Sequence, residues 1–450
     1  MLLEKTFNSI EENIINVEIF GLGYVGFPLA VKLASSGFNV IGIDVNSKRV
    51  QRLQNNDLMD SELTLKENFL IAKNNNKLKI TETPNLSEYS KIGIICVPTP
   101  IPGNDIKSDV FVTAAVEKFL QFAKKGDIII LESSIEVGTT ENIQKIIESK
   151  NFSIGKDFGL CFCPERIDPS NKEWGIENIP RVIFCSDDLT FKIAKKIYDK
   201  VNKGNLIRVN NSKIAEVVKS FENAFRLVNI SLVNELAILC DKLEISVKEV
   251  IDAAATKPFG FLPHYPGAGA GGHCIPKDPR FLLESAKKLG SEFETIENAI
   301  RVNTLMPNYI CESIEENVCK LKLPKTILVC GLSYKANVED MRDSASFKIM
   351  ANLKKMGYEV YGFDPFFNTD LIEKYLIENN LNQKTFKILD KLDDNNIEKI
   401  NSICIVQHHE VLEETINKMY EQEKFSLIYD CQNKMKKNEK SKTVLISLGN

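Results

Sequence analysis

A cysteine in a glycine-rich loop is the residue of this chain best suited to covalent chemistry. Cys274 lies in the segment Pro266–Pro279, where four glycines occur within six residues. Glycine permits backbone conformations closed to other residues and lets the chain approach a ligand closely. A thiolate can add to an aldehyde, and loss of hydride from the thiohemiacetal gives a thioester. Asp278 could accept a proton from the thiol or from water. Most loop cysteines are inert, but the glycines favour a reactive position here, without naming a substrate.

A second glycine loop near the N-terminus predicts a dinucleotide site. The strand-like run Val17–Phe20 leads into Gly21-Leu22-Gly23-Tyr24-Val25-Gly26, and a helical pattern follows. In that context the glycines allow a tight turn and close approach of a pyrophosphate to a helix N-terminus. Asp44, at the end of the next strand, could bind ribose hydroxyls and would repel a 2′-phosphate. This favours NAD over NADP, although Lys48 and Arg49 lie nearby. The alternative is a glycine turn that binds no dinucleotide.

The elements that would position these loops alternate between strand and helix, which predicts an α/β chain with parallel, doubly wound sheets. In the first half we expect strands at Val17–Phe20, Val40–Ile43, Ile92–Cys96, Ile128–Leu131 and Val182–Phe184, and helices that include Phe27–Ser35 and Val110–Phe122. In the second half we expect strands at Thr326–Cys330, Glu359–Phe363 and Ser402–Val406, and a helix at Ser344–Lys355.

Between the halves, Ser212–Lys242 keeps helical periodicity without Gly or Pro, which predicts one long helix. Two Rossmann-like domains joined by this helix would give an N-terminal NAD-binding domain at residues 1–205. A central helical region would follow at 206–310. It would include the glycine-rich segment Pro266–Pro279 that carries Cys274, which we call the thiol loop. A C-terminal domain would follow at 311–450.

Composition argues against several classes of protein. The net charge of −4 over 450 residues gives no reason to expect a nucleic-acid or membrane partner. We find no apolar run of membrane-spanning length, and charged residues interrupt the N-terminus, so no secretory signal is expected. The chain has eleven cysteines, an odd number, and they are scattered along the sequence. This indicates reduced thiols in a cytoplasmic protein. Cys161 and Cys163 are the closest pair, but no second pair completes a zinc site, so no metal is expected.

Taken in order, the motifs of this chain resemble those of the nucleotide-sugar 6-dehydrogenases, the UDP-glucose/GDP-mannose dehydrogenase family. The resemblance runs from Val17 to about Asn433. Its landmarks are GLGYVG at Gly21, CVPTP at Cys96–Pro100, ESS and GTTE within Glu132–Glu141, PER at Pro164–Arg166, KSFENAFRLVNISLVNE at Lys219–Glu235, GAGAGGHCIPKDP at Gly267–Pro279 and GLSYKANVEDMRDS at Gly331–Ser344.

The resemblance implies a four-electron oxidation that uses two NAD per turnover. Cys274 would add to an aldehyde formed from the C6 alcohol, and the resulting thioester would be hydrolysed. The family's catalytic lysine and asparagine fall on Lys219 and Asn223, which share one helix face and could stabilise an oxyanion. A solvated helix face is the alternative. Glu165 matches a glutamate that could activate water, and Asp278 matches the aspartate beside the thiol.

Cofactor and substrate positions follow from the same resemblance. Those implied for NAD are Gly21, Gly23, Tyr24, Val25, Gly26, Asp44, Val97, Pro98, Thr99 and Ser133. The C-terminal half would bind the UDP moiety, with Lys335 and Arg342 at its basic positions. Those implied for the sugar and uridine are Tyr265, Gly267, Gly271, Arg166 and Arg226, of which the two arginines could equally be structural ion-pair residues. The long helix would form a homodimer interface.

Local sequence bears on which sugar is oxidised. His273 precedes the thiol where UDP-glucose members typically have Ser. Together with Pro164–Asn171 and Thr256–Gly267, it looks most like UDP-N-acetylglucosamine 6-dehydrogenases. UDP-N-acetylmannosamine is the second choice and UDP-glucose the third.

The chain departs from the family pattern at three places. Ser134 stands at the position of a catalytic-loop Thr and keeps its hydroxyl. Glu136 replaces a common Pro, which puts an acid near the expected nicotinamide. Gln432 stands where relatives usually have Arg, so that substrate contact is not carried over.

Two other functions remain open on sequence alone. A two-electron dehydrogenase of the 6-phosphogluconate type would share the two-lobed plan without needing a thiol. A non-catalytic regulator that binds NAD or a nucleotide sugar would need no catalytic set at all.

Overall fold

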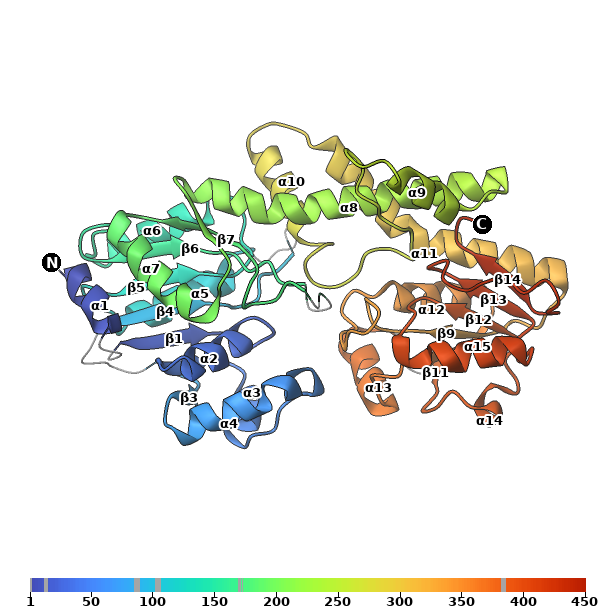
Figure 1. Ribbon diagram of the computed structural model, residues 1–450, viewed down its shortest axis with the longest axis horizontal. Coiled ribbons are helices and arrows are strands. Elements are labelled where there is room, and N and C mark those ends of the chain that lie inside the picture. The colour runs from blue at the N-terminus through green and yellow to red at the C-terminus, as the bar shows by residue number, and fades with distance from the viewer. Residues whose placement is uncertain are drawn as a thin grey trace. The chain divides into compact units, whose positions relative to one another are not determined.

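The computed structural model describes residues 2–11, 15–84, 90–101, 107–168, 171, 173–381 and 386–450. These residues form two compact units, each built on its own sheet (Figure 1). The first unit comprises Met1–Glu222 and Arg280–Glu292, and the second comprises Asn223–Pro279 and Phe293–Asn450. The predicted α/β class with two nucleotide-binding-type sheets and a long helix is confirmed. The finer division at residues 205 and 310 stays a prediction.

The first unit is built on an eight-stranded sheet in the order β3-β2-β1-β4-β5-β6-β7-β8. Its strands are β1 (Asn16–Phe20), β2 (Asn39–Ile43), β3 (Leu78–Thr81), β4 (Lys91–Ile95), β5 (Ile128–Leu131), β6 (Gly159–Phe162), β7 (Arg181–Cys185) and β8 (Leu206–Val209). Its helices are α1 (Leu2–Glu11), α2 (Gly26–Ser35), α3 (Ser47–Gln54), the 3-10 turn η1 (Asp60–Leu65), α4 (Lys66–Asn74), α5 (Val110–Leu120), α6 (Thr139–Ser149), α7 (Asp188–Val201) and most of α10 (Asp278–Lys288). The five strands predicted in this half are all present.

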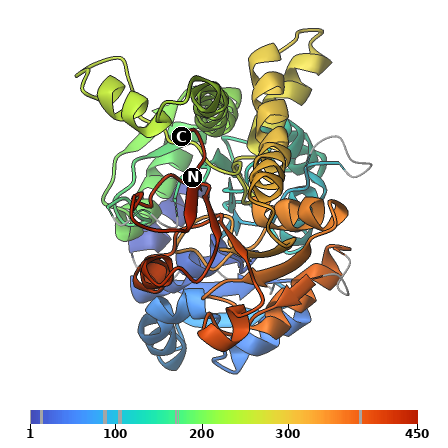
Figure 2. The same cartoon turned by 90° about the vertical axis from the view of Figure 1, so that its right-hand side faces the viewer.

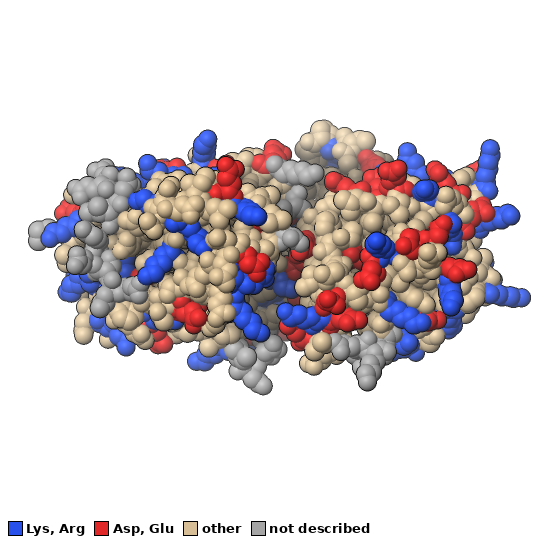
Figure 3. All heavy atoms as spheres, turned by 90° about the horizontal axis from the view of Figure 1, so that it is seen from below, with Lys and Arg blue, Asp and Glu red and all other residues tan. Residues whose placement is uncertain are grey.

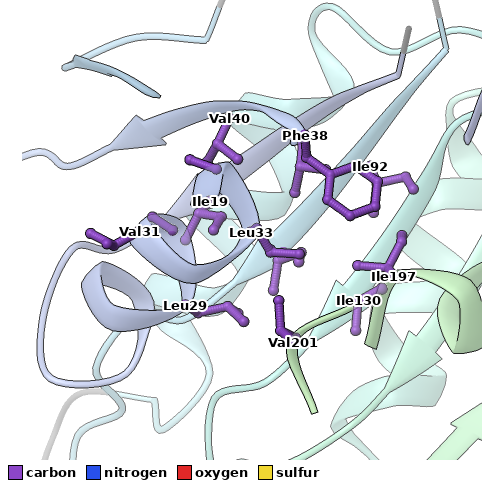
Figure 4. Close-up of a cluster of buried hydrophobic side chains, with 14 of the residues drawn as sticks. Ile19, Leu29, Val31, Leu33, Phe38, Val40, Ile92, Ile130, Ile197 and Val201 are labelled. Atoms are coloured by element: carbon purple, nitrogen blue, oxygen red, sulfur yellow. The ribbon is translucent and has the colours of Figure 1, made fainter. Parts of the chain in front are cut away.

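Strand β5 shows why helices cover both faces of this sheet. Ile128 and Ile130 belong to a buried cluster with residues of α2 and α7, part of which Figure 4 shows. Ile129 and Leu131 belong to a second cluster, with residues of α5 and α6. Successive side chains of a strand point to opposite faces, so a continuous apolar run is buried on both. Each such side chain contributes about 1.5–3 kcal/mol when fully buried.

The register of the central strands brings the loops with chemical potential to one edge. Phe20 pairs with Ile43 of β2 and with Ile95 of β4, so these three strands end at the same level. We call this side of the sheet, where the parallel strands end, the carboxyl edge. The glycine loop, Asp44 and the segment after β4 all follow there. Ligands of doubly wound sheets bind at this edge, where the strand order reverses, here between β1 and β4.

One strand pair departs from the predicted parallel arrangement. β6 and β7 run antiparallel, with Cys161 paired with Cys185. A parallel connection needs a crossover, usually a helix, and the described residues between β6 and β7 form no helix. β7 therefore begins at the carboxyl edge, which places its first residue, Arg181, beside the loops that follow β5 and β6. Cys161 and Cys163 are fully buried, as predicted for structural thiols.

The second unit repeats the plan with a six-stranded parallel sheet in the order β11-β10-β9-β12-β13-β14. Its strands are β9 (Thr326–Cys330), β10 (Glu359–Phe363), β11 (Phe386–Ile388), β12 (Ser402–Ile405), β13 (Leu427–Asp430) and β14 (Val444–Ser447). Its helices are α9 (Val247–Ala255), α11 (Glu294–Leu321), α12 (Ala345–Lys355), α13 (Thr369–Glu378), α14 (Asp394–Ile397), the 3-10 turn η3 (Glu410–Leu412) and α15 (Glu413–Glu421). The three strands and the helix predicted here are confirmed.

Strand β9 is buried on both faces in the same way. Ile327 and Val329 belong to a cluster with residues of α11 and α12, whereas Leu328 and Cys330 belong to a cluster with residues of α15. Helices accordingly cover both faces of this sheet (Figure 2).

The predicted long helix is confirmed as α8 (Ser212–Leu243), which begins in the first unit and ends in the second. Among the described residues, α8 is long and apolar enough to cross a membrane, judged by length and composition alone. The prediction that no apolar run reaches that length is therefore wrong for this helix. The match is weak evidence, because packed core helices pass the same test. Within the second unit Ser231 Oγ donates to the Ala299 carbonyl at 2.8 Å, as expected of a packed helix.

Candidate active site

The N-terminal glycine loop has no room for a side chain at two of its glycines. Gly21 has a φ of +92°, and a Cβ there would lie 2.7 Å from Cys96 O. A Cβ on Gly26 would lie 1.9 Å from Gly21 O. A Cβ on Gly23 would meet no described atom within 4 Å, so the space there is open. α2 begins at Gly26, and its N-terminal N–H groups and dipole favour an anion. The loop therefore fits a dinucleotide pyrophosphate.

Asp44 follows β2 directly and is held by two backbone N–H groups. Leu22 N donates to Oδ2 at 2.8 Å, and Asn46 N donates to Oδ1 at 2.9 Å. A carboxylate has about four acceptor positions, so capacity for ribose hydroxyls remains. The nearby Arg49 is paired with Glu62 and also donates to Leu22 O at 3.0 Å. Its charge is therefore committed within the unit, which supports NAD rather than NADP.

A serine hydroxyl joins the loops that follow β4 and β5. Ser133 Oγ donates to the Val97 carbonyl at 2.7 Å. Thr99 is buried, Pro98 is exposed, and Ser134 is half buried immediately after Ser133. These residues lie at the carboxyl edge, where sequence predicts cofactor and water contacts. Their contacts with NAD stay predictions.

Two further residues predicted to contact the cofactor lie within the glycine loop. Tyr24 is half exposed and Val25 immediately precedes α2. Both lie between Gly23 and Gly26, and their contacts with NAD also stay predictions.

The acid that replaces a common proline is not left as an unbalanced charge. Glu136 forms an ion pair with Lys288 at the end of α10, and Ser108 Oγ donates to it at 3.0 Å. Lys288 lies 152 positions away in the sequence, so sequence alone gave no sign of it. The pairing reduces the effect that Glu136 would have on a nearby nicotinamide.

Glu165, the predicted water-activating residue, is held by three donors. Its Oε1 accepts the backbone N–H groups of Arg166 at 2.6 Å and Ile167 at 2.7 Å. Its Oε2 lies 3.2 Å from Arg181 Nη2. Sequence reasoning missed Arg181, because an arginine at the start of an apolar strand carries no local sign of a site.

Arg166 forms an ion pair inside the first unit. Its Nε lies 3.1 Å from Glu222 Oε2, and its Nη2 lies 2.5 Å from Oε1. Its Nη1 donates to the Pro180 carbonyl at 2.8 Å. These contacts favour the structural alternative for Arg166, and its contact with the sugar stays a prediction.

The thiol loop is held along its length by groups of the second unit. Asn234 Oδ1 accepts from Gly267 N at 2.9 Å. Asn303 bonds Ala270 twice, accepting from its N at 2.6 Å and donating to its O at 3.0 Å. Gly272 N donates to the Arg342 carbonyl at 3.0 Å. A fixed loop of this kind can present a side chain in a defined direction.

Cys274 lies in this loop, four residues before α10 begins at Asp278. Its thiol is exposed, and its carbonyl accepts from Asp278 N at 2.8 Å. Asp278 is buried, and Asn223 Nδ2 donates to its Oδ2 at 2.6 Å. The structure thus brings together three residues of the predicted catalytic set: a nucleophile, a carboxylate and an amide.

His273 and Lys277 flank the thiol as a contacting pair. His273 Nδ1 lies 3.3 Å from Lys277 Nζ, and Lys277 Nζ lies 3.7 Å from Asp278 Oδ1. Burial, together with the charges of Lys277 and Arg342, lowers the pKa of His273 to about 3. The imidazole is therefore neutral near pH 7. With Nδ1 facing an ammonium donor, Nε2 carries the proton and can donate to a substrate carbonyl.

Two basic residues of α8 remain available to a ligand. Lys219 lies one turn before Asn223 and is half buried. In the described part of the chain the Lys219 ammonium forms no hydrogen bond or ion pair. Arg226 is exposed, and its guanidinium likewise forms neither with a described residue. Their predicted roles, oxyanion stabilisation for Lys219 and sugar binding for Arg226, stay predictions.

The segment Gly331–Ser344 packs against the thiol loop within the second unit. A Cβ on Gly271 would lie 2.6 Å from the Asp343 carbonyl. Asp340 binds the Arg342 guanidinium through contacts of 2.6–3.0 Å, so part of this charge is already balanced. Lys335 is half buried in the same segment. Arg342 adjoins the thiol loop through its carbonyl, which accepts from Gly272 N, and the contact of both basic residues with a diphosphate stays a prediction.

The predicted uridine and sugar loop begins at an exposed tyrosine. Tyr265 OH donates to Asp252 Oδ1 of α9 at 2.7 Å, and its ring remains half exposed. This bond fixes the ring at the start of the thiol loop, which leaves its outer face open to a ligand.

An amide network occupies the position of the usual arginine. Gln432 Nε2 donates to Gln407 Oε1 at 2.8 Å, and Gln407 Nε2 donates to the Tyr334 carbonyl at 3.1 Å. The network joins the loops after β12 and β13 to the segment after β9. It orders these loops but offers no positive charge.

Three domains of one family match the chain in sequence order. The NAD binding domain of the UDP-glucose/GDP-mannose dehydrogenase family matches residues 15–202. Its central domain matches residues 213–305, and its UDP binding domain matches residues 328–437. The glycine loop and Asp44 fall within the first match, and the thiol loop falls within the second.

Named relatives match over most of the chain. The UDP-N-acetyl-D-mannosamine dehydrogenase of Methanococcus vannielii is 33% identical over 442 residues, which cover 95% of each protein. The UDP-N-acetyl-D-glucosamine 6-dehydrogenase of Salmonella typhi is 31% identical over 365 residues, which cover 80% of this chain and 84% of the relative. The structure of the UDP-D-ManNAc dehydrogenase from Pyrococcus horikoshii matches with a TM-score of 0.84 at 28% identity, over 96% of this chain and 99% of the other.

These matches agree with the geometry of the glycine loop, and NAD is the cofactor. The chain belongs to the UDP-glucose/GDP-mannose dehydrogenase family and is an NAD-dependent nucleotide-sugar dehydrogenase.

Proposed function

We propose that this chain oxidises the C6 alcohol of a UDP-N-acetylhexosamine to a carboxylate, with Cys274 as the covalent nucleophile. One observation carries the proposal: an exposed cysteine, Cys274, lies four residues before a buried carboxylate, Asp278, that is oriented by Asn223. A two-electron dehydrogenase would not need that arrangement.

The chemistry divides among residues that the chain supplies. The glycine loop and Asp44 would hold NAD, which would supply the hydride acceptor for both oxidations. Cys274 adds as a thiolate to the C6 aldehyde, and Lys219 and Asn223 stabilise the negative oxygen of the adduct. After the second oxidation, Asp278 and Glu165 position and deprotonate the water that cleaves the thioester. Each alcohol thus consumes two NAD and one water.

An N-acetylated UDP-sugar is supported by the relatives and by the match to a UDP binding domain. The relative named for the manno epimer is more identical to this chain, over more of its length, than the relative named for the gluco epimer. We therefore place UDP-N-acetylmannosamine first and UDP-N-acetylglucosamine second, which reverses the order expected from sequence motifs. UDP-glucose remains third.

Two measurements on the full-length protein test this function. NADH formation is followed with UDP-N-acetylmannosamine, UDP-N-acetylglucosamine, UDP-N-acetylgalactosamine and UDP-glucose, and the preferred sugar is the one with the highest kcat/KM. NADH formed per sugar consumed is then measured to completion. We expect about two, because each oxidation transfers one hydride. A ratio of about one would exclude the thioester route.

The assembly we propose is a homodimer formed through α8. Large apolar side chains are exposed along this helix at spacings of four and seven, which places them in one stripe. They are Phe221, Phe225, Leu232, Leu239 and Leu243, with exposed fractions of 48–62%. Contiguous exposed apolar surface of this kind marks an interaction site. Sedimentation equilibrium of the wild type and of Leu232→Glu would test it, with a shift toward monomer expected in the variant.

We propose that the enzyme works in the cytoplasm and supplies a uronic-acid sugar for a surface polysaccharide. Its eleven cysteines are all free thiols, which suits a reducing compartment. On the face shown in Figure 3, Lys and Arg side chains are interspersed with Asp and Glu. That face therefore offers no broad basic patch for a nucleic-acid partner.

A further inference from the structure

A buried arginine joins the loop that carries Glu165 to the loop that carries the two serines. Arg181 is 1% exposed at the start of β7. Its Nη2 lies 2.9 Å from Glu132 Oε2 and 3.2 Å from Glu165 Oε2. Glu132 directly precedes Ser133, and Glu165 lies in the loop after β6. One guanidinium group therefore bridges two loops at the carboxyl edge.

Further contacts fix this guanidinium in place. Tyr198 OH of α7 donates to Glu132 Oε1, and the Arg181 guanidinium lies 4.7 Å from the centre of the Tyr198 ring. Arg181 Nη2 also lies 3.4 Å from the Cys163 carbonyl. Burial raises the pKa of Glu132, and the guanidinium opposes that rise. Buried ion pairs are costly, and apolar residues of similar volume often serve stability as well or better. Stability alone therefore does not explain this cluster.

The cluster restricts how Glu165 can meet a water molecule. A carboxylate offers about four acceptor positions. In the described part of the chain, two backbone N–H groups take positions on Oε1, and Arg181 takes one on Oε2. About one position on Oε2 is left. Its direction depends on where Arg181 holds that oxygen.

We propose that Arg181 is a positioning residue, which, with Glu132 and Tyr198, directs the remaining acceptor position of Glu165 toward the water that hydrolyses the thioester. The inference rests on the proposed function, because it requires a thioester on Cys274. In the step, a water proton passes to Glu165 as the water oxygen bonds to C6. The C6–S bond breaks, Cys274 leaves as a thiolate, and the product is the carboxylic acid. Arg181 acts on this step and not on either hydride transfer.

The test uses Arg181→Lys, Glu132→Gln and Tyr198→Phe in the full-length protein. A lysine ammonium keeps the charge but lacks the planar guanidinium that lies 4.7 Å from the centre of the Tyr198 ring. The Tyr198 variant keeps the ring and removes only the hydroxyl. Lys91→Met is the matched control, because Lys91 forms another buried ion pair, with Glu18 at 3.2 Å. Lys91 is the first residue of β4, so it lies at the amino ends of the central strands, opposite the carboxyl edge of the same sheet.

Each variant is mixed rapidly with NAD and the preferred UDP-sugar. NADH is recorded before the steady state, and acid-quenched protein is weighed by intact mass spectrometry. With Arg181→Lys we expect a burst of about two NADH per subunit, then turnover slowed by about 10-fold or more, with adduct accumulating on Cys274. Glu132→Gln and Tyr198→Phe should show the same pattern with smaller slowing. Lys91→Met should show the adduct level of the wild type, even if it melts at a lower temperature.

The inference is overturned if folded Arg181→Lys shows the same burst and adduct level as the wild type and Lys91→Met. If Arg181→Lys does not fold, Tyr198→Phe and Glu132→Gln decide, and wild-type adduct levels in both would refute the proposal. Failure of the underlying function shows separately. In that case the wild type itself yields about one NADH per sugar, and Cys274→Ala turns over normally.

Discussion

Asn223 Nδ2 donates to Asp278 Oδ2 at 2.6 Å, a bond that joins α8 to the first residue of α10. Asp278 is fully buried, and a buried carboxylate needs such donors to remain in place. The amide therefore supports the acid, and it is also the oxyanion donor that we propose. Its two N–H groups allow both roles at once.

Replacing this amide by a carboxylate should damage catalysis more than removing it. Asn223→Asp places two acids within hydrogen-bond distance, so one must stay protonated. We expect kcat to fall about 100-fold or more, and about 10-fold in Asn223→Ala, where only donors are lost. Steady-state kinetics with the preferred UDP-sugar measures both. Asn229→Asp is the matched control on the same helix, since Asn229 Nδ2 bonds only the Phe225 carbonyl among described partners. Equal losses in Asn223→Asp and Asn229→Asp would argue against a catalytic role.

Removing the thiol should abolish turnover and spare the cofactor. For Cys274→Ala we expect kcat to fall by about 1,000-fold or more, as when other covalent nucleophiles are removed. NAD affinity by isothermal titration should change little, because the glycine loop belongs to the first unit and the thiol to the second. Cys319→Ser is the control, since Cys319 is also exposed but lies on α11. Full activity in Cys274→Ala would exclude it as the nucleophile.

Alanine substitutions at two glycines of the N-terminal glycine loop should have different effects. Gly26→Ala forces a Cβ to 1.9 Å from Gly21 O, so we expect a loss of about 2 kcal/mol or more in the free energy of unfolding. Gly23→Ala meets no described atom within 4 Å and should unfold like the wild type. Its methyl group would instead occupy space needed by the pyrophosphate and weaken NAD binding. Urea unfolding and NAD titration of both variants separate the two effects, and tight NAD binding by Gly23→Ala would contradict the assigned site.

His273 should make the folded state sensitive to acid. Its pKa is lowered from 6.5 to about 3 on folding, so between these values the unfolded chain binds a proton that the folded chain does not. Stability from this residue is therefore complete above pH 6.5 and is lost as the pH falls. The slope is at most about 1.4 kcal/mol per pH unit. Between pH 7.5 and 5.5, the wild type should lose about 1 kcal/mol more than His273→Gln in the free energy of unfolding. Parallel losses in the two proteins would show that His273 is not buried in its neutral form.

The elements of this fold were predictable because their signals are local. Ile128–Leu131 is a continuous apolar run, which predicts a buried strand. Ser212–Lys242 keeps helical periodicity without interruption, which predicts a helix. The GxGxxG spacing likewise lies within six residues. The direction of β7 was not predictable, because it depends on the preceding connection, whose described residues form no crossover helix, and not on the residues of β7 itself.

Site residues that belong to one sequence motif were predictable. Contacts between residues far apart in the sequence were not. Cys274 and Asp278 stand in one motif, whereas Glu136 is balanced by Lys288 from a segment 152 positions away. Arg181 contacts Glu132 and Glu165 only because three neighbouring strands meet at one edge of the sheet. Pairings of this kind depend on topology, and a single sequence without the folded chain does not reveal them.

The hydrogen bonds of Asn234 and Asn303 to the thiol loop have a consequence for turnover. Glycine-rich segments lose more conformational entropy on ordering than other segments do. Here Gly267 N and both polar groups of Ala270 are bonded to the surrounding unit, so that loss occurs during folding. Cys274, the nucleophile that we propose, would then start each catalytic cycle with its backbone already in place, and substrate binding energy would not be needed to order it.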